Sequence, residues 1–215
     1  MIDEQTEKRR SSFWRELPIL LGVAVLVAVL VRAFVLQTFY IPSPSMEHTL
    51  NVLDRVLVNK LVYDFRDPKR GEIIVFEAPK EWQSGADGED FIKRIIGVPG
   101  DHISYDPASD VKKLTINGVQ LDEPYIYRGP DGQQDAPADA KFDITVPPDR
   151  LWVMGDHRSA SGDSLEHWQD SSEDIQEATI PEGSIVGRAF TVFWPVGRAT
   201  WLTVPNGFNA IPDAK

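Results

Sequence analysis

The chain has 215 residues, of which 42% are hydrophobic and 26% charged, a composition typical of a globular protein with one or two domains. Its 33 Asp and Glu residues outnumber its 22 Lys and Arg residues and give a formal net charge of -11. Nucleic-acid-binding proteins present basic surfaces, so this balance argues against nucleic acid as a partner. The chain has no cysteine, which excludes disulfides and thiolate zinc sites.

A long apolar run near the N-terminus is the first element that the sequence predicts. Residues 17–36 carry a single charge, Arg32, and are long enough for one transmembrane helix if Arg32 extends toward the bilayer surface. Several basic residues precede the run, whereas a stretch without Lys or Arg follows Arg32. The positive-inside rule therefore places residues 1–16 in the cytoplasm and residues 37–215 outside the cytoplasmic membrane.

Two other interpretations of this run are weaker. A cleaved secretory signal also has a basic start and an apolar core, but residues 32–35 (Arg-Ala-Phe-Val) provide no small-x-small cleavage site. A buried helix of a soluble domain fits poorly because the run is apolar on every face.

After this run the pattern changes to short β-branched and aromatic runs separated by turn residues, which predicts β-strands. The expected strands lie in Arg55–Tyr63, Gly71–Pro79, Asp90–Ile103, Lys113–Leu121, Arg150–His157 and Gly183–Pro195. Asn117-Gly118 between two apolar runs indicates a hairpin, and no long helical period follows the transmembrane run. The predicted fold class is mostly β, an exported β-rich domain preceded by one transmembrane helix.

Two polar, acidic stretches interrupt the predicted strands, at residues 80–90 and 128–141. Their Gly, Pro and Asp content predicts exposed, mobile loops. We expect residues 105–150 as a whole to form a β/loop insertion that takes no part in catalysis.

The stretch IPSPSMEHTL, residues 41–50, carries two serines, each directly preceded by a proline. Pro42 and Pro44 fix their own φ and hold the preceding residues extended, so the segment is stiff, as a nucleophile requires. Ser43 and Ser45 lie two apart and point the same way on an extended segment. A stiff juxtamembrane loop without catalytic function explains the same residues, so the two serines alone do not distinguish a catalytic segment from a plain loop.

A serine nucleophile needs a general base. The four histidines are His48, His102, His157 and His167. None lies in a context typical of a Ser-His-Asp triad or a metal site, and we expect each to be a surface or hydrogen-bonded residue. Lysine is the alternative base if burial lowers its pKa, and Lys93 has the most apolar neighbours on a predicted strand. Its neighbour Arg94 must point to the opposite face, and periodicity does not say which of the two faces inward.

At this point several blocks, taken in order, resemble bacterial type I signal peptidases. IPSPSMEHTL resembles the nucleophile block, DRVLVNKLVY the next strand, KRGEIIVFEAP and FIKRIIGVPGD the block with the general-base lysine, and MGDHRSASGDS a Gly-Asp-x-Arg block. The matches run from about Gln37 to Ser164, with a weaker one at GSIVGRAF. The resemblance implies a β-rich catalytic domain of the signal-peptidase type. It also implies a membrane-bound serine endopeptidase that cleaves N-terminal signal peptides from exported preproteins after an Ala-x-Ala site.

The resemblance also implies roles for single residues. Ser45 would be the nucleophile and Lys93 its general base. The hydroxyl of Ser43 and the backbone N–H of Ser45 would form the oxyanion hole. Ser161 would hydrogen-bond the lysine ammonium and orient it.

Other matched positions would support this site. Arg94 would pair with Asp156, and Asp163 would brace the same region through Arg158 or neighbouring groups. Two shallow apolar pockets would accept the small side chains of a substrate bound as an added β-strand. The matched pocket positions are Phe39, Ile41, Pro42, Met46, Leu50, Val56, Phe91 and Ile92.

Three positions depart from the family pattern. His48 replaces the usual Pro, Leu53 stands where Gly is common, and Leu165 stands where Arg is frequent, which removes a possible partner for Asp163. These changes affect the expected fine geometry and substrate range more than the expected activity.

Alternatives within and outside this class stay open. The protein could be a specialised peptidase for a narrow substrate set such as pilus subunits, or a non-catalytic paralogue that binds preproteins. A self-cleaving repressor of the Ser-Lys type would need a DNA-binding helix-turn-helix, which the N-terminal apolar run does not fit. The expected partners are signal-peptide-bearing preproteins and membrane lipid, and no metal or organic cofactor is implied. An anchor shared with the preprotein's own apolar segment would raise their effective concentration.

Overall fold

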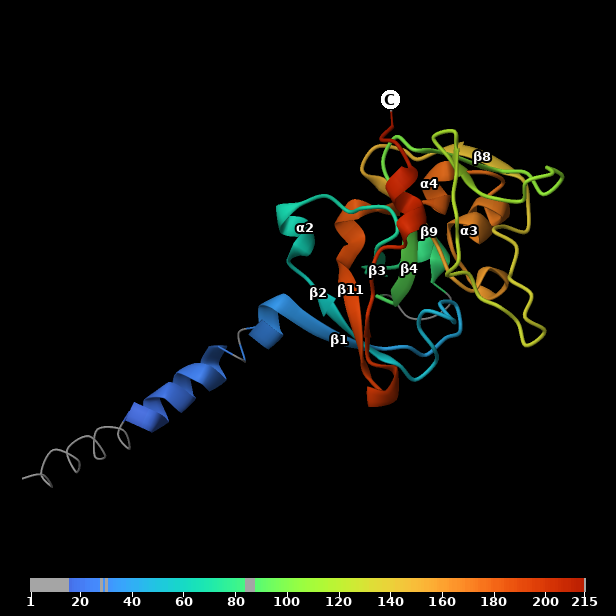
Figure 1. Ribbon diagram of the computed structural model, residues 1–215. Helices are drawn as coiled ribbons and strands as arrows, with labels where there is room; N and C mark the ends of the chain where they lie inside the picture. Colours follow the sequence, from blue (N-terminus) through green and yellow to red (C-terminus); the bar gives the residue numbers. More distant parts are fainter. Residues whose placement is uncertain (1–15, 28, 30, 84–87, 215) are drawn as a thin grey trace, which may run out of the picture. The chain divides into compact units, whose positions relative to one another are not determined.

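The protein is described by a computed structural model that covers residues 16–27, 29, 31–83 and 88–214 (Figure 1). The chain divides into two compact units, residues 1–37 and 38–215. The expected cytoplasmic segment lies outside the described residues except for its last position, and the predicted loop at residues 80–90 is described only in part.

The first unit contains helical backbone within the predicted transmembrane run. Residues 16–27 are α-helical, and a π-helical turn, η1 (Val31–Val35), lies further along the chain. In the part of the chain that the structure describes, no helix is both long and apolar enough to cross a membrane.

An eight-stranded sheet forms the centre of the second unit, in the order β1-β2-β11-β3-β4-β9-β10, with β12 paired to β11. Its strands are β1 (Leu36–Tyr40), β2 (Arg55–Asn59), β3 (Ile73–Glu77), β4 (Asp90–Gly97), β9 (Arg150–Met154), β10 (Ile180–Pro181), β11 (Ile185–Trp194) and β12 (Thr200–Trp201). The β2–β11, β3–β11, β3–β4 and β4–β9 pairs are all antiparallel. The predicted mostly-β fold class is therefore confirmed for this unit.

A second, four-stranded sheet, in the order β7-β6-β5-β8, has three of its strands within the expected insertion. Its strands are β5 (His102–Tyr105), β6 (Thr115–Ile116), β7 (Val119–Gln120) and β8 (Phe142–Thr145). The predicted hairpin is present, because Asn117 (φ 51°) and Gly118 (φ 82°) both adopt the left-handed conformation that a tight two-residue turn requires.

Short helical elements connect the strands. They are α2 (Val62–Phe65), η2 (Lys80–Trp82), η3 (Arg158–Ala160), α3 (Ser164–Asp170), α4 (Ile175–Ala178), η4 (Glu182–Ser184), η5 (Val196–Arg198) and η6 (Asn206–Ala210). Asp163 and Asp174 cap α3 and α4, each accepting a hydrogen bond from the backbone N–H two residues on. The sequence predicted none of these helices, because elements this short show no full helical period.

Several predicted strands end earlier than expected; the one expected in Arg150–His157 stops at Met154, and two others are interrupted by a turn. The strand expected in Arg55–Tyr63 stops at Asn59, whose side-chain oxygen accepts from Leu61 N at 2.9 Å and turns the chain into α2. The strand expected in Asp90–Ile103 is two strands, because β4 ends at Gly97 and a turn with Gly100 at φ 84° leads into β5 of the other sheet.

The loop at the start of the predicted 128–141 stretch is a hydrogen-bonded turn. Arg128 and Gln134 form a β-bridge, and Gly129 N donates to Gln133 O at 2.8 Å. Residues 130–133 at its tip are exposed.

Strand β3 separates two apolar cores, which explains its unbroken apolar sequence. Ile73 and Val75 pack into one core, whereas Ile74 and Phe76 pack into the other. Strand β4 lies between β3 and β9 (Figure 1). It is buried from Lys93 to Gly97, so both of its faces are covered there.

Candidate active site

The serine turn, residues 43–50, follows β1, and its apolar side chains pack into one of the apolar cores. Met46 and Leu50 are 0% exposed, and Glu47 N donates to Pro44 O at 2.9 Å within the turn. Ser45 is consequently only 7% exposed, although Pro44 before it and His48 after it in the turn are exposed.

The structure brings Lys93 and Ser45 together. Lys93 Nζ lies 2.9 Å from Ser45 Oγ, and Lys93 is 4% exposed on the central strand β4. The ammonium also lies 5.6 Å from the ring centroid of Phe91, two residues back on the same face. A lysine in this position has lost most of its water and has one hydroxyl as its close polar neighbour.

Burial lowers the pKa of Lys93 from 10.5 to about 8. Three carboxylates, Asp163, Glu166 and Asp156, oppose this change because they stabilise the ammonium. Near pH 8 a substantial fraction of the amine is therefore neutral and able to accept a proton, which an ordinary lysine cannot do.

Ser43 lies beside this pair, with its Oγ 3.3 Å from Ser45 Oγ. It is exposed, so its hydroxyl can reach a bound molecule as well as the serine. The two hydroxyls and the amine thus form one polar cluster at the mouth of the buried site.

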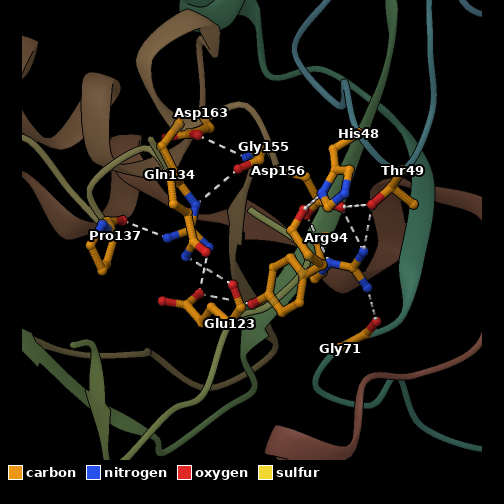
Figure 2. Close-up of polar contacts among 12 residues, drawn as sticks. His48, Thr49, Gly71, Arg94, Glu123, Gln134, Pro137, Gly155, Asp156 and Asp163 are labelled. Atoms are coloured by element: carbon orange, nitrogen blue, oxygen red, sulfur yellow. Dashed lines mark hydrogen bonds and ion pairs between the residues drawn. The ribbon is translucent and has the colours of Figure 1, made fainter. Parts of the chain in front are cut away.

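Gly155 directly follows β9, and its missing side chain lets the backbone there approach Ser45 and Ser161 closely. A Cβ at this position would lie 2.3 Å from Ser161 Oγ and 2.4 Å from the Ser45 carbonyl oxygen, far inside contact distance. Gly155 N donates to Asp163 Oδ2 at 2.9 Å (Figure 2). Gly155 was not among the predicted site residues, although its place at the head of the Gly-Asp-x-Arg block was a usable signal.

The expected hydrogen bond between Ser161 and Lys93 is absent. Ser161 Oγ is buried and makes no hydrogen bond to any residue that the structure describes. It borders a cavity of about 460 Å³ that Asp163 and Glu166 also line. The close approach to Gly155 holds this hydroxyl near the site without fixing its direction.

Arg94 points to the face of β4 opposite Lys93 and is equally buried. Its guanidinium donates to both carboxylate oxygens of Asp156, at 2.8 and 2.6 Å, and to Gly71 O at 2.8 Å (Figure 2). Thr49 of the serine turn donates to the same carboxylate. This network joins β4, the serine turn and the segment after β9, and the structure shows the expected Arg94–Asp156 contact.

Of the two expected routes by which Asp163 could brace the site, Arg158 or neighbouring groups, the structure shows the second, because Arg158 makes no hydrogen bond to Asp163. Its guanidinium instead donates to Glu123 Oε1 at 2.6 Å and to Gly155 O at 2.9 Å. Asp163 binds the backbone N–H groups of Gly155 and Leu165, so it braces the site through its neighbours. Glu123 was not predicted as a site residue, because no motif marks it and it lies far from Arg158 along the chain.

The expected pocket residues divide into two groups. Ile41, Met46, Leu50 and Val56 are 0–1% exposed and form core beneath the site, so in this structure they do not line an open pocket. Phe39 and Ile92 are half-buried at the edge of the same core, Phe91 is half-buried against the other core, and Pro42 is exposed.

The three departures from the family pattern have structural correlates. His48 and Leu53 both adopt positive φ, 83° and 76°, and proline cannot adopt the first of these values. His48 Nδ1 lies 3.0 Å from Tyr125 O, across from the serine turn (Figure 2). Leu165 is 5% exposed and packs into the core beside Trp168.

No metal site is apparent at this location or elsewhere in the described residues, where no three His, Asp or Glu side chains gather to hold an ion. The chemistry available is that of a buried amine against a hydroxyl. Serine hydrolases that use lysine in place of histidine as general base have this arrangement.

Comparisons with known proteins agree with this class. The family model described as "Signal peptidase, peptidase S26" matches residues 14–194. A probable signal peptidase I-2 of Synechocystis sp. is 37% identical, over 94% of this chain and 85% of that protein. A signal peptidase I of Leptolyngbya laminosa is 39% identical, over 87% of this chain and 83% of that protein. The chain therefore belongs to the signal peptidase family, peptidase S26.

One solved structure, a signal peptidase I from Enterococcus faecalis V583, aligns with 26% identity and a TM-score of 0.40. The alignment covers 57% of this chain and 97% of that chain.

Proposed function

We propose that this protein is a membrane-anchored endopeptidase that removes signal peptides from exported preproteins after an Ala-x-Ala site, with Ser45 as nucleophile and Lys93 as general base. The observation that carries both roles is the 2.9 Å contact between Lys93 Nζ and Ser45 Oγ in a chain of the signal peptidase family. The proposal gives the buried amine a task that its lowered pKa suits.

In the acylation step, Ser45 Oγ attacks the carbonyl carbon of the scissile bond while the neutral amine of Lys93 takes the hydroxyl proton. The Ser45 N–H and the Ser43 hydroxyl donate to the oxyanion that forms. The lysine ammonium then gives its proton to the leaving nitrogen as the C–N bond breaks. The mature protein leaves with a new N-terminal amine, and the signal peptide stays as an ester on Ser45.

In the deacylation step, Lys93 takes a proton from a water molecule that attacks the ester carbonyl. The same two donors stabilise the second oxyanion. Collapse of this intermediate breaks the bond to Ser45 Oγ, and the proton on Lys93 returns to that oxygen. The site then holds free serine and neutral lysine again.

We also propose that residues 17–36 anchor the chain in the cytoplasmic membrane, with residues 37–215 outside. The run is apolar in sequence, and its helical part exposes apolar side chains such as Ile19 (67%) and Leu21 (65%). Water solvates such a surface poorly, whereas a bilayer accommodates it.

A second apolar surface lies on the β-domain, and we propose that it also contacts lipid. The hairpin surface, defined as Trp194, Val196 and Trp201, is 52–72% exposed at the β11–β12 connection. Arg198 in the same connection donates to Asp54, which places the exposed Leu53 next to it. Exposed Trp beside aliphatic residues is typical of a membrane-interface contact.

The first test is cleavage of a preprotein with a known Ala-x-Ala site by the full-length protein in lipid, with the N-terminus of the product sequenced. We expect one cut after the Ala-x-Ala site, and a loss of at least about 10³-fold in kcat for Ser45→Ala and Lys93→Ala. Lys141→Ala is the matched control, because Lys141 is an exposed lysine that pairs with Asp106 and is far from Ser45 in the fold.

Each result separates the alternatives. Near-normal cleavage by Lys93→Ala would rule out the lysine-base mechanism. Cleavage of only a few preproteins from a broad panel would indicate a specialised peptidase. Stable binding of an Ala-x-Ala peptide by the wild type without turnover would indicate a non-catalytic binder.

A further inference from the structure

His157, the variable residue of the Gly-Asp-x-Arg block, contacts the serine turn on both sides of Ser45. Its backbone N–H donates to the Ser45 carbonyl oxygen at 3.1 Å. Its ring Nδ1 lies 3.2 Å from the Pro44 carbonyl oxygen and 3.4 Å from Glu47 Oε2. One residue therefore holds the peptide carbonyls before and after the Ser45 nitrogen and α-carbon.

The chemistry of these partners fixes the position of the ring proton. A carbonyl oxygen and an ionised carboxylate can only accept hydrogen bonds. Nδ1 of His157 must therefore carry a hydrogen, whether or not Nε2 is also protonated. The ring is a donor to Pro44 O in both charge states.

The ring is held in one orientation. It stacks on Tyr127 with centroids 3.8 Å apart and planes 22° apart, and the side chain is only 13% exposed. Tyr127 is fixed in turn, because its N–H donates to Asp156 O at 2.9 Å. Tyr127 belongs to the segment that the sequence analysis expected to take no part in catalysis.

The carbonyl that His157 holds belongs to the same peptide unit as the Ser45 N–H. This peptide is trans, so its C=O and N–H point in opposite directions in one plane. Pro44 O also accepts from Glu47 N at 2.9 Å, so both lone pairs of the oxygen are engaged. Fixing this oxygen fixes the direction of the Ser45 N–H, and a hydrogen bond to the carbonyl polarises the amide and strengthens its donor.

We propose that His157 is a positioning residue that aims and strengthens the Ser45 N–H as an oxyanion donor by hydrogen-bonding Pro44 O. The proposal rests on the proposed function, in which that N–H binds the oxyanion. The oxyanion exists only in the transition state and the intermediates, so the contribution of His157 belongs to kcat and not to KM.

The kinetic test compares three variants of the full-length protein in lipid. His157→Phe keeps the ring stacked on Tyr127 and the backbone N–H but loses the Nδ1 donor. His157→Asn loses the stack but places an amide N–H close to the position of Nδ1. His102→Phe is the matched control, because His102 is half-exposed and pairs with Asp143 on the small sheet.

We expect His157→Phe to lower kcat about tenfold with KM within about twofold of the wild type, a loss typical of a misaimed catalytic group. His157→Asn should recover most of this loss, and His102→Phe should leave both constants unchanged. Unchanged kcat in His157→Phe, or equal losses in Phe and Asn, would overturn the proposal, because the donor would then not be the cause.

A spectroscopic test does not depend on turnover. The chain has only two Pro-Ser dipeptides, at 42–43 and 44–45. Labelling with carbonyl-¹³C proline and ¹⁵N serine therefore gives two signals that correlate a proline carbonyl with the amide of the following serine. The signal that disappears in Ser43→Ala belongs to 42–43, which assigns the other to 44–45. The Pro44 carbonyl and Ser45 amide shifts should move in His157→Phe and return toward the wild-type values in His157→Asn. Unmoved Ser45 and Pro44 shifts in His157→Phe would overturn the proposal even if kcat fell. A wild type that cleaves nothing would end the proposed function, while these shifts would still decide the positioning role.

Discussion

At the scale of single residues, the burial of Lys93 in β4 has two opposite effects: it lowers the pKa of the amine, and it costs folding free energy. The strand is buried on both faces, so a charged amine on it pays a desolvation cost that an exposed lysine avoids. The three nearby carboxylates reduce this cost only in part, because the pKa still falls to about 8. The buried amine is therefore expected to destabilise the fold while it serves as the proposed general base.

Lys93→Met tests how much the buried amine destabilises the folded state. Burial makes the folded pKa lower than the unfolded pKa, so the unfolded state holds more protons between pH 8 and 10.5 and stability rises with pH across that window. At pH 7 the variant should therefore be more stable than the wild type by up to about 3 kcal/mol, and the difference should fall toward zero as pH approaches 10.5. Urea unfolding at pH 7, 8.5 and 10 measures this; a variant less stable at pH 7 would contradict it.

The same pKa gives the pH dependence of the wild-type activity. Because only the neutral amine accepts a proton, kcat/KM should rise with pH below about 8 and level off above it. A profile that is flat from pH 6 to 9 would contradict a lysine base with this pKa.

The sequence could identify these residues only in part. Apolar neighbours singled out Lys93, but the choice between Lys93 and Arg94 stayed open, because a strand with two buried faces has no outward side. The resemblance to a family indicated Ser45 with Lys93 before any distance was known. Nothing in the sequence marked Glu123 or the hydrogen bonds of His157, since both depend on contacts between distant segments.

At the scale of elements, the Arg94–Asp156 pair connects β4 to the segment after β9 and to the serine turn. Both side chains are at most 2% exposed, and the pair makes two parallel hydrogen bonds. Alternating apolar runs predicted the long strands well, because half or full burial leaves a clear pattern. The two-residue strands β10 and β12 and the helices α3 and α4 were missed, since they depend on caps and tertiary packing.

Asp156→Asn should therefore destabilise the fold strongly. It removes the counter-charge of a buried guanidinium, a change that typically costs about 3–5 kcal/mol. Asp122→Asn is the control, because Asp122 is 73% exposed in its pair with Lys113 and its loss should change stability by less than about 0.5 kcal/mol. Thermal unfolding of both variants compares them; similar melting temperatures would show that the buried pair contributes no more than a surface pair.

At the scale of the whole molecule, two apolar surfaces face outward, one on the N-terminal helix and one on the hairpin surface. The first was visible in the sequence as a long uninterrupted run. The second was not, because plain alternation along the strand would put Trp194 on the same face as buried Val192. In the structure a β-bulge between these two residues instead places Trp194 opposite exposed Arg55.

Trp194→Gln combined with Trp201→Gln tests the hairpin surface as a lipid contact. In bilayers with brominated lipids, bromine quenches tryptophan fluorescence at the depth of the label. Both proteins carry Trp14→Phe, because Trp14 adjoins the proposed anchor and the same lipids would quench it. In this background the double variant should lose most of the quenching that headgroup-proximal bromine causes in the protein that keeps Trp194 and Trp201. Trp82→Phe is the control, since Trp82 is 5% exposed and its removal should leave the quenched component intact. Equal quenching in the double variant and the protein that keeps both tryptophans would show that the hairpin surface stays in water.

The exposed turn at residues 130–133 has a practical consequence in a chain without cysteine. Replacing Gln133 with cysteine would create the sole thiol in the protein, at a position that takes part in the hydrogen bonds of the turn only through its backbone N–H and carbonyl. A fluorophore or spin label attached there would report on the β-domain without competing sites. The label would lie six residues from Tyr127, whose ring stacks on His157 beside the serine turn. It would therefore report movement of the segment that supports that turn.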